Sequence, residues 1–291
     1  MELSAVRVVT VAFNPGSELE EFAGSLADAT RAPTTLVIVD NGTEHDIVDD
    51  IAGRYGARVI RPGANLGYGA AANLGAAEAD EPWLVVANPD IAWTPGSLDV
   101  LLEAGGRHPG AGSLGPMVLN TDGTVYPSAR AIPSLLHGLG HAVFVRWWPR
   151  NPWTQSYHRQ QERVLFAEHP AGWLSGSCLL LRREAFDQVG GFDTDYFMFF
   201  EDVDLGDRLG KAGWQNVFVP SAEVVHDQGA SWRQRPAAMI RAHHRSAERY
   251  LHRRYDGWHH TPLRRAISAG LRARLWWETR EYAGHQGSVP P

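Results

Sequence analysis

The sequence of 291 residues contains a single cysteine, Cys178. One cysteine excludes an intrachain disulfide framework and any metal site built from several thiolates. Its setting, Ser-Gly-Ser-Cys-Leu-Leu-Leu, is typical of a buried strand, so we expect an inert, packed thiol. The composition suits a reducing compartment.

Long hydrophobic runs are also missing. No stretch reaches the roughly 18 apolar residues that a membrane-spanning helix needs. The N-terminus has neither the cationic region nor the small-residue cleavage site of a signal peptide. These absences predict a protein that is soluble or peripheral on a membrane.

Lysine is nearly absent, and positive charge is distributed unevenly. Lys211 is the only lysine among 27 basic residues, and the net charge is −6. Residues 233–280 nevertheless hold twelve arginines against three acidic residues. A basic C-terminal segment on an acidic protein indicates an anionic partner. Because no standard nucleic-acid-binding motif is present, we do not expect that partner to be a nucleic acid.

The first 120 residues alternate strand and helix signals. Short β-branched runs are typical of buried parallel strands, and between them apolar residues recur with helical spacing. This alternation predicts an α/β fold with a mostly parallel central sheet flanked by helices. The expected strands are Val6–Ala12, Thr34–Val39, Ala57–Arg61 and Trp83–Ala87, and the segment Gly67–Ala79 is expected to be a helix.

The alternation weakens after Ser113. Residues 127–165 are rich in proline and tryptophan, which predicts a long irregular insertion within a catalytic domain of residues 1–235. Residues 236–291 have the composition of a basic helical extension. Between these segments we expect strands at 172–182, 217–219 and 223–225 and a helix at 202–212.

Polar side chains follow three of the expected strands: Asn14, Asp40, and the pair Asn88 and Asp90. In an open α/β sheet, ligands bind beyond the carboxyl ends of the strands. Asp40 is placed to bond a nucleotide base or ribose, although Asp-Asn-Gly is also a common turn. Asp90 is placed to hold a divalent cation on a nucleotide diphosphate. The alternative role for Asp90 is to cap the next helix.

Residues 65–73 contain a glycine pattern, Gly-x-Gly-x-x-Ala, flanked by Asn65 and Asn73. A dinucleotide-binding fold would place such glycines after the first strand, where this sequence reads Asn-Pro-Gly-Ser-Glu. The pattern therefore disfavours a dehydrogenase. Glycines at a helix N-terminus, Gly67 first, still permit close approach of a diphosphate.

The strongest local signal is the group Glu201, Asp202 and Asp204, which follows five aromatic or apolar residues. Helix capping accounts for one or two of these carboxylates. Near a sugar-binding cleft, one of them is suited to deprotonate an acceptor hydroxyl. His226 ends a later apolar run and is either a neutral metal ligand or a structural histidine.

Together, over positions 8–226, these motifs resemble the inverting GT-A-fold glycosyltransferases of family 2. The resemblance implies that Asp202 is the catalytic base and that Glu201 and Asp204 shape its surroundings. It also implies a divalent cation, Mg²⁺ or Mn²⁺, bound by Asp90 and His226. Many relatives carry an acid where this sequence has Asn88. The residues implied for donor binding are Asn14, Asp40, Asn65, Gly67, Asn73 and Asn88.

Within that family, the segments 123–130, 148–154 and 196–198 are similar to those of bacterial rhamnosyltransferases. This narrower resemblance implies dTDP-β-L-rhamnose as donor and polyprenyl-diphospho-GlcNAc as acceptor, at the cytoplasmic face of the cell membrane. Another family 2 enzyme with a galactofuranosyl, glucosyl or deoxysugar donor is the alternative. A non-catalytic nucleotide-sugar-binding scaffold is a further one, although such a protein needs no base.

The C-terminal extension combines arginines with apolar residues, among them Leu271, Leu275, Trp276 and Trp277. This mixture predicts an amphipathic helix at an anionic membrane surface. A solvated helix packed on the catalytic domain is the alternative, and the same helices suit a homodimer contact.

Overall fold

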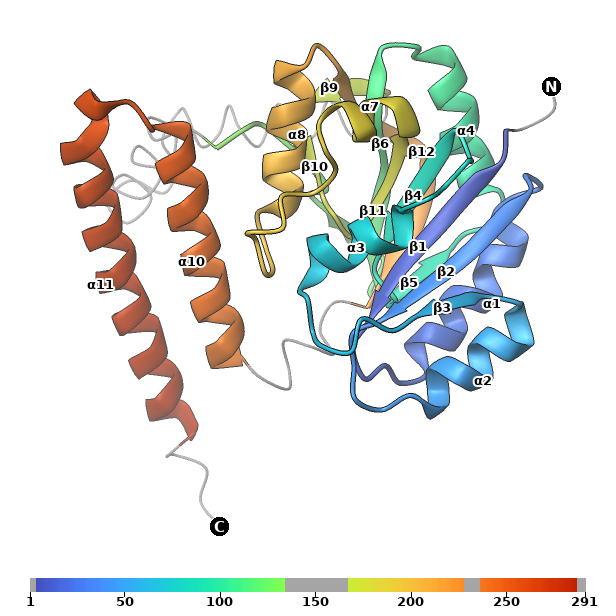
Figure 1. Cartoon of the computed structure of the whole chain (residues 1–291), viewed down its shortest axis with the longest axis horizontal. Coiled ribbons are helices and arrows are strands. Elements are labelled where there is room, and N and C mark those ends of the chain that lie inside the picture. Colours follow the sequence, from blue (N-terminus) through green and yellow to red (C-terminus); the bar gives the residue numbers. More distant parts are fainter. Residues whose placement is uncertain (1–3, 134–166, 228–235, 287–291) are drawn as a thin grey trace.

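The computed structural model describes residues 4–133, 167–227 and 236–286 (Figure 1). In its N-terminal half, adjacent strands pair in parallel, as the buried β-branched runs predict. All seven residues of the first strand are buried, so both faces of the sheet are covered. The parallel strands are β1 (Val6–Ala12), β2 (Thr34–Asp40), β3 (Arg58–Ile60) and β4 (Trp83–Ala87).

Two layers of helices cover the sheet, and alternate strand residues face one or the other. Val8 and Ile38 pack in the cluster that contains helices α1, α2 and α4, whereas Val9 and Val39 pack in the cluster that contains α3, α7 and α8. This is the period of two expected of strands buried on both faces. The helices are α1 (Glu18–Ala29), α2 (Asp46–Tyr55), α3 (Tyr68–Ala76), α4 (Ser97–Arg107), α7 (Arg183–Gln188) and α8 (Glu201–Lys211).

The C-terminal half of the sheet is mixed. Strand β11 runs antiparallel between β4 and β6, and β12 pairs in parallel with β6 and antiparallel with β5. The strand order is therefore β3-β2-β1-β4-β11-β6-β12-β5. The added strands are β5 (Ile91–Trp93), β6 (Ala111–Asn120), β11 (Cys178–Arg182) and β12 (Gln215–His226), with β7 (Val125–Tyr126) and β9 (His169–Ala171) paired at their sides.

Several element boundaries differ from the sequence prediction. The single strand expected at 172–182 is two strands, β10 (Trp173–Leu174) and β11, because residues 175–177 turn toward helix α8. The two strands expected at 217–219 and 223–225 are one long strand, β12, with an irregularity between Val219 and Glu223. Strands β5 and β6 and helix α4 were not predicted, although the apolar residues of α4 recur with helical spacing.

The first residues of the predicted insertion are regular. Residues 129–130 form strand β8 (Ala129–Arg130), which pairs antiparallel with β10. Residues 134–166, with the tryptophans of that segment, lie outside the described residues.

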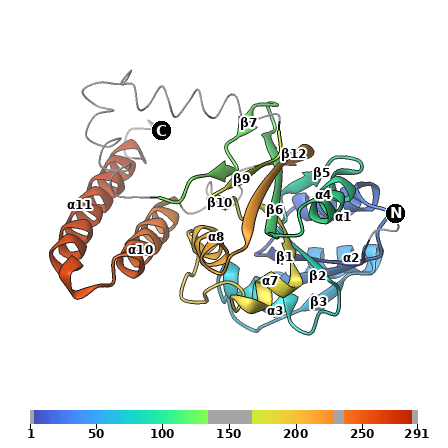
Figure 2. The same cartoon turned by 90° about the horizontal axis from the view of Figure 1, so that it is seen from above.

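The C-terminal extension is a helical hairpin that starts at Pro236. Figures 1 and 2 both show it on the α8 side of the sheet, joined to the sheet domain through α10. It consists of α10 (Pro236–Arg254), the short helix η1 (Trp258–His260) and α11 (Thr261–Gln286). Within the three described ranges, no helix combines the length and apolarity needed to cross a membrane.

Cys178 is buried at the start of β11. Burial raises the pKa of its thiol well above the ordinary value. The prediction of an inert, packed cysteine is therefore confirmed.

Candidate active site

His226 at the end of β12 meets Asn88 and Asp90, which follow β4 and are more than 130 residues away in the sequence. The Nε2 atom of His226 lies 3.0 Å from Oδ1 of Asp90 and 3.2 Å from Nδ2 of Asn88. The side chains of His226 and Asp90 are 11% and 16% exposed. The structure thus brings together the two residues implied as metal ligands, with Asn88 beside them. No group of three or more His, Cys, Asp or Glu side chains suited to a metal occurs in the described part of the chain.

A short backbone segment joins this corner to the carboxylate group of α8. The backbone N–H of Asn88 donates to the carbonyl oxygen of Ser177 at 2.9 Å. The preceding N–H, that of Gly176, donates to Oδ2 of Asp202 at 2.8 Å. The turn at residues 175–177 therefore links Asp202 to the segment that carries Asn88 and Asp90.

Asp202 occupies the first turn of α8, where the helix dipole favours negative charge. Its Oδ1 accepts a hydrogen bond from the backbone N–H of Val203 at 2.8 Å. Burial raises the pKa of Asp202 above its ordinary value, while the N–H groups of Gly176 and Val203 and the charge of Arg130 act in the opposite direction. Each carboxylate oxygen keeps a second lone pair. A half-buried carboxylate held in this way is suited to accept a proton from a bound hydroxyl.

Glu201, the neighbour of Asp202, is a buried acid that lacks a full set of partners. Its side chain is 7% exposed, and its Oε2 atom has no hydrogen-bond partner within the described segments. Burial first, and then the charge of Asp202, raise the pKa of Glu201 to about 8. At neutral pH, this shift favours the protonated form of Glu201.

The raised pKa of Glu201 makes stability depend on pH. The unfolded state loses this proton near the ordinary pKa of 4.5 and the folded state only near 8. The free energy of unfolding should therefore fall as pH rises through that window. Replacing Glu201 with Gln removes this contribution, so the stability difference between variant and wild type should shift in favour of the variant by up to roughly 1.4 kcal/mol per pH unit. Urea unfolding at pH 5, 6.5 and 8 measures this stability difference. If the free energies of unfolding of the two proteins change with pH in parallel, the raised pKa of Glu201 is contradicted.

The N-terminus of α3 is connected to the turn that holds Asp202. Gly67 has a φ of 83°, and a Cβ there would lie 2.3 Å from the carbonyl oxygen of Phe197, so only glycine fits. Asn65 accepts a hydrogen bond from the Gly67 N–H at 2.9 Å. Tyr68 donates its hydroxyl to the Gly176 carbonyl at 2.9 Å. Asn65 and Gly67 thus shape the loop that supports Tyr68 and, through Gly176, the Asp202 turn.

Asn14 and Asp40 lie at the ends of β1 and β2. Asn14 accepts hydrogen bonds from the backbone N–H groups of Thr43 and Glu44 and ties the two loops together. The Asp40 side chain is fully buried; its Oδ2 lies 2.6 Å from Nδ1 of His45 and 3.2 Å from Nε of Arg61. His45 and Arg61 are exposed by about two fifths, so they form the outer surface of this pair of loops.

Asn73 is used inside the protein. Its side-chain amide donates to the carbonyl of Phe192 at 2.8 Å and accepts from the Phe192 N–H at 2.9 Å. These two bonds hold the turn at residues 190–192, where Gly191 has a φ of 70°. Both the oxygen and the nitrogen of the Asn73 amide therefore already have protein partners. A direct contact of Asn73 with the donor stays a prediction.

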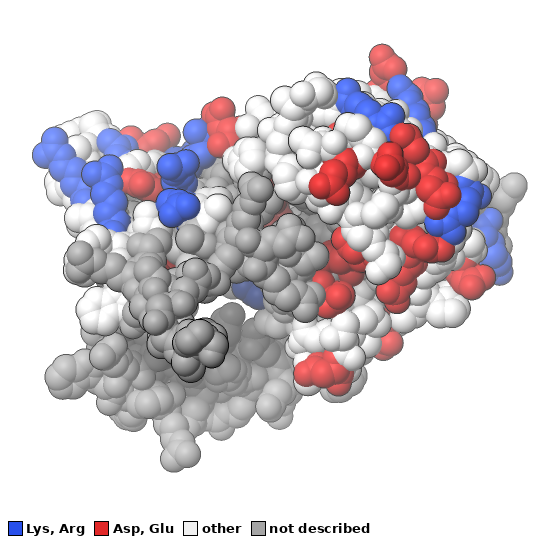
Figure 3. Space-filling view, turned by 90° about the horizontal axis from the view of Figure 1, so that it is seen from below, with Lys and Arg blue, Asp and Glu red and all other residues white. Residues whose placement is uncertain are grey.

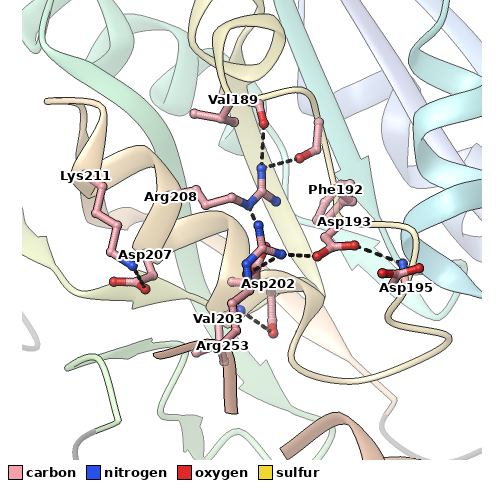
Figure 4. Close-up of polar contacts among 12 residues, drawn as sticks. Val189, Phe192, Asp193, Asp195, Asp202, Val203, Asp207, Arg208, Lys211 and Arg253 are labelled. Carbon is pink, nitrogen blue, oxygen red and sulfur yellow. Dashed lines mark hydrogen bonds and ion pairs between the residues drawn. The ribbon is translucent and has the colours of Figure 1, made fainter. Parts of the chain in front are cut away.

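Asp204 faces the C-terminal hairpin. It pairs with Arg208 at 2.5 Å and with Arg253 of α10 at 3.6 Å. Figure 4 shows Arg253 also reaching Asp193, in the loop before α8. Asp204 therefore shapes the surroundings of Asp202 by fastening α8 to neighbouring elements.

The turn that leads into Asp202 rests against α10, which sequence reasoning did not indicate. Phe199 and Phe200 have φ values of 67° and 66°, and each such residue costs about 1–2 kcal/mol. Ser246 donates to the carbonyl of Met198 at 2.7 Å, and the Phe200 ring contacts Tyr250, with 5.8 Å between ring centroids. Helix α10 therefore stabilises an unfavourable backbone directly before the carboxylates at the start of α8. The aromatic run 196–200 was its only signal in the sequence.

The hairpin carries two adjoining basic hollows. Figure 3 shows arginines gathered over it, whereas acidic side chains predominate over the sheet domain in that view. The hollows have volumes of about 590 and 350 Å³ and share His252. The larger one is lined by Arg245, Glu248, Arg249, His252 and Arg253.

The chain matches a known family over most of its length. The family described as "Glycosyltransferase like family 2" matches residues 4–247. The N-acetylglucosaminyl-diphospho-decaprenol L-rhamnosyltransferase of Mycobacterium tuberculosis (strain H37Rv) is 51% identical over 279 residues, which cover 92% of this chain and 90% of that protein.

Solved structures of two glycosyltransferases share the fold. GalNAc-T7, solved with UDP, GalNAc and Mn²⁺, is 15% identical with a TM-score of 0.58, over 77% of this chain and 44% of the other. The mannosyltransferase PcManGT from Pyrobaculum calidifontis, solved with GDP-Man and Mn²⁺, is 17% identical with a TM-score of 0.56, over 100% of this chain and 77% of the other. At these identities the likeness concerns the fold alone, and it confirms the predicted GT-A architecture.

Proposed function

The chain belongs to glycosyltransferase-like family 2, and from this premise we propose that it transfers L-rhamnose from dTDP-β-L-rhamnose to a polyprenyl-diphosphate-linked N-acetylglucosamine. The observation that carries the proposal is the position of Asp202. The 175–177 turn bonds Asp202 through the Gly176 N–H and bonds the Asn88 N–H through the Ser177 carbonyl, so it links Asp202 to the strand end that carries Asp90. The extensive identity to the mycobacterial rhamnosyltransferase supports the choice of sugar and acceptor.

The proposed reaction is a single displacement at the anomeric carbon. Asp202 accepts the proton of the acceptor hydroxyl as that oxygen forms its bond to the anomeric carbon. The bond from this carbon to the diphosphate oxygen breaks on the opposite face, and dTDP leaves. One base and one displacement invert the configuration, so a β-L-rhamnosyl donor yields an α-L-rhamnoside. The burial that raises the pKa of Asp202 strengthens it as a base.

The donor set at the corner fits a divalent cation. Oδ1 of Asp90 and Nε2 of His226 lie 3.0 Å apart, and both offer lone pairs at a partly exposed position. Two protein ligands are what Mg²⁺ or Mn²⁺ often has when substrate phosphates and water complete its coordination. When bound, such an ion neutralises charge on the departing diphosphate. Asn88, in a position where many relatives carry an acid, would contact the histidine and not the ion.

For the nucleotide, we propose that the β1 and β2 loops form the binding surface. The buried Asp40 orients His45 and Arg61, which are exposed. A direct bond from Asp40 to the base requires that one of these two partners move. Asn14, Asn65 and Gly67 hold the loops on either side.

The proposal is tested by transfer of radiolabelled rhamnose from dTDP-rhamnose to polyprenyl-diphospho-GlcNAc, with and without a chelator. Chelator-sensitive transfer with an α-linked product supports it. A protein that binds dTDP but transfers no rhamnose would reject the sugar or the acceptor. A protein that does not bind dTDP would reject the donor nucleotide.

We further propose that the hairpin rests on an anionic membrane surface, where the lipid acceptor is located. Trp276 and Trp277 are 55% and 61% exposed, and Trp258 at the hairpin turn is 87% exposed. Leu271 and Leu275 are half-buried, so the tryptophans rather than the leucines are available to a bilayer. Each nearby arginine adds roughly 1 kcal/mol of attraction to anionic lipid.

Vesicle flotation measures this contact. The protein should float with vesicles that contain phosphatidylglycerol, and binding should weaken with salt and with neutral vesicles. Replacing both Trp276 and Trp277 with Ala should reduce binding about tenfold or more, because each buried aromatic contributes about 1.5–3 kcal/mol at most. Trp258→Ala is the matched variant at the other end of the hairpin. Equal flotation of wild type with neutral and anionic vesicles would contradict the electrostatic contact.

A further inference from the structure

Arg130 is a cation held rigidly at the edge of the active site. Its guanidinium carbon lies 5.3 Å from the centre of the Tyr126 ring and 5.4 Å from that of Trp173. Its Nε donates to the carbonyl of Pro127 at 2.8 Å. Strand β8 fixes its backbone opposite Trp173 in β10. Two aromatic rings and one hydrogen bond therefore set both the position and the direction of the guanidinium.

The terminal nitrogens of Arg130 have no partner in the described part of the chain. No carboxylate forms an ion pair with this arginine there, and its one hydrogen bond to a described residue uses Nε. Arg182 shows what a structural arginine on a tryptophan does here. It stacks on Trp83 at 4.5 Å and donates to three carbonyl oxygens, those of Gly105, His108 and Ala111. Arg130 has the same stacking but keeps the donors of its planar fork available, a geometry that matches phosphate oxygens.

The position of Arg130 relative to Asp202 indicates which of the two substrates Arg130 would contact. Along the segment 173–177, Trp173 pairs with Arg130, Gly176 bonds Asp202, and Ser177 bonds Asn88 at the Asp90 corner. Along this segment, the contact with Asp202 thus lies between the contact with Arg130 and the contact with Asn88, beside the site proposed for the donor diphosphate. An acceptor hydroxyl must reach Asp202, so the rest of the acceptor extends toward the Arg130 side.

We infer that Arg130 binds the diphosphate of the lipid-linked acceptor, with Tyr126 and Trp173 as the rigid support of its guanidinium. The inference rests on the proposed function and adds to it the residue that would recognise the charged part of the acceptor. Arg130 is a binding residue in this scheme, and it would discriminate diphosphate-linked GlcNAc from a neutral glycoside of the same sugar.

The test compares two acceptors in Arg130→Gln and Arg130→Lys variants: a short-chain isoprenyl-diphospho-GlcNAc and a neutral alkyl β-N-acetylglucosaminide. Arg130→Gln should raise the KM and the Kd for the diphosphate acceptor about 10–100-fold, the loss expected for hydrogen bonds to a charged group. The KM for the neutral glycoside and the affinity for dTDP should not change. Arg130→Lys should restore part of the affinity because it retains the charge without the fork. Arg182→Gln is the matched control, since it removes a stacked arginine elsewhere.

Two other outcomes of these measurements would overturn the inference, each for a different reason. An equal loss with both acceptors would show that Arg130 only supports the fold or tunes Asp202. A loss of dTDP affinity would assign Arg130 to the donor diphosphate. Direct binding of the diphosphate acceptor is measured separately from transfer. Wild type that binds it in an Arg130-dependent way, yet transfers no rhamnose, would reject the proposed function and keep the inference. Equal binding by wild type and Arg130→Gln would reject the inference alone.

Discussion

Asp202→Asn should lower rhamnose transfer by about 10³-fold or more while the affinity for dTDP stays near that of wild type. The amide cannot take up the proton of the acceptor hydroxyl, and general bases contribute about 10²–10⁴-fold. The Asn side chain can still accept one of the two backbone hydrogen bonds, from Gly176 or Val203, so the turn should keep its shape. Single-turnover transfer beside calorimetric titration with dTDP separates the two effects.

Asp207→Asn provides the matched control for the base variant. Asp207 lies in the same helix and pairs with Lys211 at 2.8 Å and with Arg254 of α10 at 3.3 Å. Asn can keep a hydrogen bond to each of these partners, so transfer should stay within about twofold of wild type. Wild-type turnover in Asp202→Asn would show that another group is the base. Glu201 is the nearest alternative, because it adjoins Asp202 and its Oε2 atom has no hydrogen-bond partner within the described segments.

Asp90→Ala should weaken the metal-dependent binding of dTDP by about 100-fold or more, and transfer should fall with it. Loss of an outer-shell partner of a metal already costs about 10–100-fold, and a direct ligand should cost at least as much. The readouts are Mn²⁺ affinity by spin resonance and dTDP affinity with and without the ion. The binding of dTDP in the presence of chelator should be nearly unchanged, since Asp90 would act through the cation.

Asp122→Ala is the control for this second prediction. Asp122 is an exposed turn residue that bonds Thr124, so its removal should affect neither metal nor dTDP binding. Unchanged calorimetric affinity of Asp90→Ala for dTDP with metal would exclude Asp90 as a ligand. His226→Gln should weaken the metal-dependent binding of dTDP as Asp90→Ala does, because Nε2 of His226 lies 3.0 Å from Oδ1 of Asp90.

Helix α10 connects the C-terminal hairpin to the sheet domain next to Asp202. Ser246 and Tyr250 of α10 contact the Met198–Phe200 turn, and Arg253 pairs with Asp204 of α8. The helix that starts the extension is therefore also part of the scaffold around Asp202. The same helix would connect the proposed membrane contact of the hairpin to the geometry of the proposed base.

The sequence by itself determined the elements whose signal is local. Buried β-branched runs marked β1 and β4 at their observed limits, because a strand covered on both faces needs apolar residues at every position. The position of Asp90 at a strand end and that of Asp202 after an aromatic run indicated both residues as candidates for the site, and their roles stay predictions. Chain order and spacing were sufficient for the family resemblance, which the family match confirms.

Other features depended on contacts between distant residues. The break after Leu174, the joining of two short strands into β12, and the antiparallel position of β11 follow from pairing across the sheet. Strand preference depends strongly on such partners. A sequence window does not contain them.

The arrangement of the site was decided in the same way. Only the tertiary structure placed His226 at 3.0 Å from Asp90, 136 residues away, and directed the 175–177 turn onto Asp202. It also turned Asp40 and Asn73 inward and left the terminal nitrogens of Arg130 without a carboxylate partner in the described segments. Residue types and their order determine which chemistry is possible. The direction and the neighbours of each side chain determine which group performs it, because charge, burial and hydrogen bonding act over a few ångströms in space and not along the chain.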